Sequence, residues 1–128
     1  MITRRSRHPG PTAAIRSALA ALLWAARKCD CDHLPLPDRI AVVLCRAGCR
    51  VVPPDCPIAA WVRRQTGLAV MVAGPIPAHR GRPWSPGAVF ISAPGPGGIR
   101  PGCRVPLPTA VGRFVAAFDQ SRHLELVD

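Results

Sequence analysis

DCPIAAWVRRQTG, residues 55–67, is the clearest structural signal in the chain. Ile58, Trp61 and Val62 recur at the i, i+3, i+4 spacing that places side chains on one face of an α-helix. The run LAVMV (68–72) follows directly and has the short, apolar and β-branched character of a buried strand. This stretch therefore predicts a helix that delivers an apolar face to a core and leads into a sheet.

Both ends of this helix carry recognisable signals. Asp55 is a favourable N-cap, and Pro57 is tolerated in the first turn, where a backbone N–H would have no helical partner. Gly67 suits the left-handed residue that commonly follows a helix. Arg63 and Arg64 come after the apolar stripe, and we expect both side chains to point toward water.

Two further helices are predicted upstream. The first covers about residues 13–28, with Thr12 as its cap, and its apolar stripe consists of Ile15, Leu19, Leu22 and Leu23. The second lies in LPLPDRIAVVLCRAG (34–48), where Pro37 sets the start and Gly48 fits the position just past the end.

The chain changes character after the 68–72 strand. Sixteen of the 35 residues from Gly74 to Pro108 are glycine or proline, which excludes a helix there. Two short strands fit, at 88–92 and at 103–107, and Pro106 places the second at a sheet edge. We expect HRGRPWSPG (79–87) to be a loop that carries an exposed tryptophan.

A helical stripe returns near the C-terminus, formed by Val111, Phe114, Val115 and Phe118. The sequence as a whole predicts an α+β fold with three N-terminal helices, a small antiparallel sheet of two to three strands with long Pro/Gly-rich loops, and one C-terminal helix. Residues 12–128 are expected to form one small domain behind a flexible basic arm at 1–11. A chain of 128 residues needs neither a metal nor a disulfide to fold.

Charge is strongly one-sided, with 17 Lys and Arg residues against 7 Asp and Glu residues, a net charge of +10. The acidic residues fall in two islands, at 30–55 and 119–128, and everything from Cys56 to Phe118 is acid-free. A net charge of this size attracts polyanions and repels other copies of the chain.

The segment from Met1 to Cys29 begins like a signal peptide but does not continue like one. Arg16 interrupts its apolar run, Arg27 and Lys28 end it, and no A-x-A cleavage site follows. The uninterrupted apolar run is also far shorter than the roughly 18–20 residues of a membrane span. An organelle transit peptide stays open, but the default prediction is the cytoplasm, where thiols remain reduced.

The stretch CDCDHLP (29–35) raises the question of a metal. Cys29, Cys31, His33 and Cys56 are of the ligand types that hold structural zinc. The C-x-C spacing is tighter than the usual zinc turn, however, and free cysteines often pack as small hydrophobes. We therefore favour packed thiols and no cofactor, with a zinc-stabilised module built on the Cys29–Cys56 cluster as an alternative.

Signatures of catalysis are missing from the sequence. It contains neither G-x-S-x-G nor H-E-x-x-H, and no carboxylate pair has a recognisable frame. Cys56 stands at a predicted helix N-terminus, which lowers the pKa of a thiol, but no base accompanies it. These observations favour a binding protein over an enzyme.

Nucleic-acid association is the function that the charge indicates. Its candidate residues are Arg4, Arg5, Arg7, Arg63, Arg64, Arg80, Arg82 and Trp84. Arginines of this kind would follow phosphates without reading the sequence, while the tryptophan stacks on a base. The partner would be nucleic acid or an acidic protein, and the main alternative function is a protein–protein adaptor or assembly module.

Overall fold

The computed structural model describes residues 10–92 and 99–128, with side chains described up to Ser92 and again from Cys103. In chain order the elements are α1 (Pro11–Lys28), α2 (Leu36–Arg46), α3 (Pro57–Thr66), β1 (Val70–Ala73), β2 (Ala88–Ser92), β3 (Ile99–Pro106), α4 (Thr109–Asp119) and the short 3₁₀ helix η2 (Leu124–Leu126). Three helices, a small antiparallel sheet and a closing helix confirm the predicted α+β class.

The sheet has the strand order β1-β2-β3, and both pairings are antiparallel. Val89 lies in the central strand opposite Val72 of β1 and Val105 of β3. This register directs one row of valine and isoleucine side chains toward the helices, because successive residues of a strand point to opposite faces. The strand predicted at 103–107 is the second half of β3, which lies at an edge as Pro106 indicated.

Helix α1 begins earlier than the sequence predicted. Its first residue is Pro11 and its N-cap is Gly10, so Thr12 lies inside the helix and caps nothing. Proline is favoured at the first helical position, since its missing N–H would have no partner there. Three residues of the predicted stripe, Ile15, Leu19 and Leu22, are buried to 2% exposure or less, whereas Leu23 is only partly buried.

Helix α3 corrects the expected role of Asp55. Pro57 occupies the first turn, so the N-cap is Cys56, and Asp55 instead accepts a hydrogen bond from the backbone N–H of Cys56 at 2.9 Å. The end of the helix is as predicted: Gly67 has φ 73° and its N–H donates to the carbonyl of Arg63. Only glycine adopts this left-handed conformation without a steric cost.

Trp61 joins α3 to α1 in the core. Its side chain is 8% exposed, and its indole Nε1–H donates to the carbonyl oxygen of Ala18 at 2.8 Å. The same core contains Phe114 from α4 and Leu126 from η2, both fully buried. The C-terminal residues therefore dock, and Val51 forms an isolated parallel bridge with Val127.

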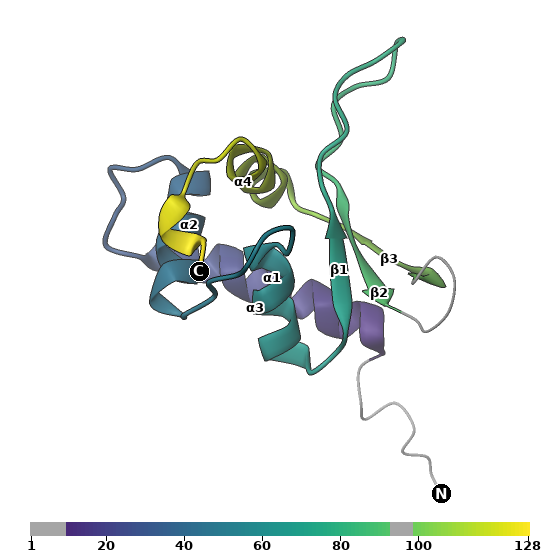
Figure 1. Ribbon diagram of the computed structural model, residues 1–128, viewed down its shortest axis with the longest axis horizontal. Helices are drawn as coiled ribbons and strands as arrows, with labels where there is room; N and C mark the ends of the chain where they lie inside the picture. The colour runs from purple at the N-terminus through teal and green to yellow at the C-terminus, as the bar shows by residue number, and fades with distance from the viewer. Residues whose placement is uncertain (1–9, 93–98) are drawn as a thin grey trace, which may run out of the picture.

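Residues 74–87 form a hairpin arm, although their composition predicts a loop. Ile76 exchanges two backbone hydrogen bonds with Ser85, and His79 exchanges two with Arg82. The tip residues Arg80 and Gly81 both have positive φ, 47° and 78°, as a two-residue type I′ turn requires. Four prolines lie between or beside the bonded residues: Pro75, Pro77, Pro83 and Pro86. Figure 1 shows this arm continuing from β1 and β2 well beyond the rest of the molecule.

The helices gather on one side of the sheet in Figure 1, and α4 lies beside the base of the hairpin arm. Gly112 of α4 makes this approach close, because a Cβ atom at that position would lie 2.5 Å from Cβ of Pro86. Within the described ranges, no helix combines the length and the apolar character needed to cross a bilayer.

Candidate nucleic-acid interface

The tip of the hairpin arm presents two of the predicted cations. Arg80 and Arg82 flank Gly81 and are exposed, as is the neighbouring His79. No carboxylate lies within ion-pair distance of either guanidinium among the described side chains. Because the arm projects from the body (Figure 1), both charges are accessible to a large polyanion.

Trp84 lies lower on the arm and is less accessible than predicted. Its ring is partly buried, and the guanidinium of Arg113 from α4 stacks over it at 4.7 Å from the ring centroid. A cation in this position is attracted by the negative face of the indole. The tryptophan thus fastens the arm to α4 and holds Arg113 beside it, and one ring face is already occupied.

Arg63 and Arg64 differ from the expected pair of solvent-directed cations. Arg63 is half-buried, forms an ion pair with Asp55 and also donates to the carbonyl of Val70. Arg64 remains exposed but donates to the carbonyl of Ala47. Both side chains therefore link α3 to neighbouring segments, and the charge of Arg63 is compensated within the protein.

Apart from Arg63 of α3, the residues that form ion pairs among the described side chains lie outside the acid-free segment 56–118. Arg46 meets Asp30 at 3.1 Å, and this hydrogen bond and charge lower the pKa of the Asp30 carboxyl. His123 lies 3.5 Å from Asp38 and 3.6 Å from Glu125. The acid-free segment 56–118 contributes α3, the sheet, the arm and nearly all of α4, and Asp119 at the end of α4 lines a pocket with Pro75 and Trp84 at the base of the arm.

Two arginines of the acid-free segment 56–118 were not among the residues predicted to bind nucleic acid. Arg104 lies on β3 and Arg113 on α4, and both are exposed without a carboxylate partner among the described side chains. The candidate interface consequently comprises Arg80, Arg82, Arg104 and Arg113. Arg4, Arg5 and Arg7, which were also predicted, lie outside the described residues.

The four candidate zinc ligands do not assemble into a site. Among the described residues, no group of three or more His, Cys, Asp or Glu side chains is placed to hold a metal ion. Cys29, Cys31 and His33 lie in the turn after α1, whereas Cys56 caps α3. The six cysteines of the chain are free thiols.

Cys56 also differs from an activated thiol. Burial raises its pKa to about 11, even though the N–H groups of Ile58 and Ala59 at the start of α3 act in the opposite direction. Burial outweighs the helix terminus here because the thiolate would lose its hydration in an apolar setting. The thiol therefore stays protonated near neutral pH and packs as a small apolar group.

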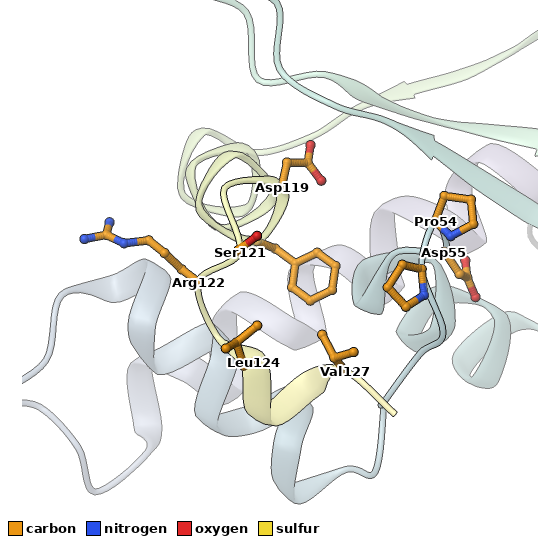
Figure 2. A pocket seen from close by; sticks show the side chains of 9 residues that line it. Pro54, Asp55, Asp119, Ser121, Arg122, Leu124 and Val127 are labelled. Carbon is orange, nitrogen blue, oxygen red and sulfur yellow. The ribbon is translucent and has the colours of Figure 1, made fainter.

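An apolar groove of about 370 Å³ opens between the segment before α3, the end of α4 and the C-terminal residues. Pro54, Leu124 and Val127 line it, and Leu124 is 65% exposed. Figure 2 shows Asp119 above these residues, with Arg122 pointing away from the groove. Partial burial raises the pKa of Asp119 above that of a free aspartate, and no cation lies within ion-pair distance among the described side chains.

Comparisons with known proteins give no further guide to this interface. No protein-family model, curated protein sequence or solved structure matches the chain.

Proposed function

We propose that the protein binds nucleic acid without sequence specificity, with the hairpin arm as the principal element that contacts phosphates. The observation that carries this proposal is the position of Arg80 and Arg82 on a projecting tip, inside a segment with no acidic residue between Asp55 and Asp119. Arg113, held beside the arm by Trp84, adds a third cation.

Phosphate binding of this kind is electrostatic. Guanidinium groups release condensed counterions from the nucleic-acid backbone, so affinity falls steeply as salt rises. Arginine suits this task because its planar fork donates two parallel hydrogen bonds to a phosphate. The proposal includes action in the cytoplasm, a reducing compartment with which six free thiols are compatible.

Neutralising the tip tests the proposal directly. We expect Arg80→Gln/Arg82→Gln to weaken binding to a fluorescent DNA duplex roughly 5- to 30-fold at low salt, because two exposed charge contacts are lost. The slope of log K against log salt should become shallower by about 1.8, or about 0.9 for each lost phosphate contact. Fluorescence anisotropy between about 50 and 200 mM salt measures both quantities.

A matched variant separates position from net charge. Arg50→Gln/Arg122→Gln removes the same charge from exposed side chains near the C-terminal acidic island, and it should reduce affinity much less. Equal losses in the two variants would contradict the role of the arm. Absence of binding by the unmodified protein at low salt would refute nucleic-acid association altogether.

The apolar groove favours a second candidate function, a protein-docking module. We infer that its occupant is a partner segment in which a large apolar side chain adjoins a Lys or Arg. The apolar group would contact Leu124 and Val127, while the cation would meet Asp119, which has no ion-pair partner among the described side chains. Val52, at 65% exposure, extends the apolar surface beside Pro54.

Peptide display tests this second function. Peptides selected on the unmodified protein should be enriched in Leu, Phe or Trp next to Lys or Arg, and their binding should fall at least about tenfold with Val52→Ser/Leu124→Ser, as expected when two apolar contacts are lost. Asp119→Asn should weaken the same peptides at low salt. Selected peptides that bind the serine variant unchanged, or no enrichment at all, would exclude the groove as a docking site.

A further inference from the structure

The outward face of the sheet carries a row of three side chains, one from each strand. The pairing register places Met71 of β1 opposite Phe90 of β2, and Phe90 opposite Arg104 of β3. The three residues therefore stand side by side across the sheet. Met71 is 42% exposed, Arg104 is exposed, and the ring of Phe90 is partly exposed between them.

The helices lie on the other face. Met71, Phe90 and Arg104 each have a valine next to them along the strand: Val70, Val89 and Val105, respectively. Each valine is exposed by 5% or less and belongs to the core formed with α1 and α3. Because side chains alternate along a strand, the row of Met71, Phe90 and Arg104 points away from that core. The sheet thus has one face committed to folding and one available for binding.

The chemistry of the row fits an unpaired base beside a phosphate. A phenyl ring on the central strand offers a flat π surface, and the polarisable thioether of Met71 widens it. The guanidinium of Arg104 can stack on a neighbouring base or donate to a phosphate. Bases inside a duplex are already stacked on one another, so only a single strand can present a base face to Phe90.

Charge complementarity argues for a nucleic acid over an apolar protein surface as the occupant. Arg104 lies in the acid-free segment 56–118, and β1 and β2 continue directly into the arm that carries Arg80 and Arg82. A strand bound at the sheet would therefore find further cations along the arm. An apolar protein surface would leave the Arg104 charge without a partner.

We propose that single-stranded nucleic acid is the preferred ligand and that one of its bases stacks on Phe90, with Arg104 at the adjoining phosphate. This inference rests on the proposed nucleic-acid function and names its ligand class. The arm supplies sequence-independent phosphate contacts, and the outward sheet face distinguishes a single strand from a duplex.

Phe90→Leu tests the stacking contact, because leucine keeps the apolar character and strand preference but lacks a π face. Binding to a fluorescent single-stranded oligothymidylate should weaken roughly 5- to 150-fold, the range for loss of one stacked base. Binding to a duplex at the same salt should stay unchanged, and Phe90→Tyr should retain single-strand binding. Arg104→Gln should also make the single-strand salt slope shallower by about 0.7.

The outcomes separate this inference from the function on which it rests. If Phe90→Leu binds the single strand as the unmodified protein does, or if the unmodified protein favours the duplex, the sheet inference fails while arm-mediated binding stands. If neither ligand binds at low salt, both fail. Analytical sedimentation measures the oligomeric state of the same variants. If the unmodified protein is a dimer and Phe90→Leu is a monomer, this face is an interface between two copies of the chain and the inference is overturned. Circular dichroism confirms that each variant is folded.

Discussion

Trp61→Ala is expected to lower the free energy of unfolding by about 3–5 kcal/mol, the range for truncating a large buried aromatic side chain. The change would leave a cavity between α3 and α1 and remove the hydrogen bond from the indole to the carbonyl of Ala18. For a domain whose total stability is of the order of 5–15 kcal/mol, this is a large fraction. Urea denaturation followed by circular dichroism measures the loss.

Trp24 provides the matched control for this experiment. It is the same residue type, but it lies on α1 with 64% of its surface exposed, where it contacts Lys28. We expect Trp24→Ala to change the free energy of unfolding by no more than about 0.5 kcal/mol, as is usual for surface substitutions. Equal losses from the two substitutions would contradict the placement of Trp61 in the core.

Gly87→Ala is expected to destabilise the protein by about 2–5 kcal/mol, since a strained conformation and an overpacked contact act together. Gly87 has φ +91°, and a Cβ atom there would lie 2.3 Å from the carbonyl oxygen of Ala73 and 2.8 Å from the backbone of Gly74. These neighbours are main-chain atoms at the base of the arm and cannot rotate away. Thermal and urea unfolding measure the effect.

Gly67→Ala isolates the conformational part of that effect. Gly67 also has positive φ, but a Cβ atom would meet nothing within 4 Å. Its substitution should cost only about 1–2 kcal/mol, the price of a left-handed residue. A Gly87 variant no less stable than the Gly67 variant would show that the two sides of the arm base are not in close contact.

Helices were the most predictable part of the fold, because apolar periodicity reports directly which face is buried. The stripe of Ile58, Trp61 and Val62 identified α3 correctly. The cap was less predictable: Asp55 and Cys56 both precede Pro57, and only the backbone decides which of them is the N-cap. N-cap propensity alone favoured Asp55. Its carboxylate instead accepts a hydrogen bond from the N–H of Cys56 and forms an ion pair with Arg63.

The hairpin arm could not be predicted from composition. A stretch so rich in proline and glycine resembles a loop, and the alternation of an ordinary strand is absent. The paired residues Ile76, His79, Arg82 and Ser85 are non-proline residues whose N–H groups all donate across the arm. The turn also needs positive φ at Arg80, a conformation that arginine seldom adopts.

The candidate interface was predictable only where charge was local. Arg80 and Arg82 were predicted because their segment lacks acids, and both are exposed at the tip of the arm. The role proposed for Arg104 depends on a strand register that puts it beside Phe90, and no sequence pattern gives that register. Conversely, Arg63 was predicted to be a free cation of the interface, but its charge is paired with Asp55, eight residues earlier. This ion pair could not be predicted, because it arises only when the segment before α3 turns back toward the helix.

The prolines of the hairpin arm have a consequence for solubility. A two-stranded ribbon has two open edges, and unpaired N–H groups along such edges recruit strands from other copies and start β-aggregation. Pro75, Pro77, Pro83 and Pro86 carry no N–H, so they deprive those edges of donors while the bonded pairs hold the ribbon together. The arm can therefore extend into solvent at high protein concentration without templating edge-to-edge assembly.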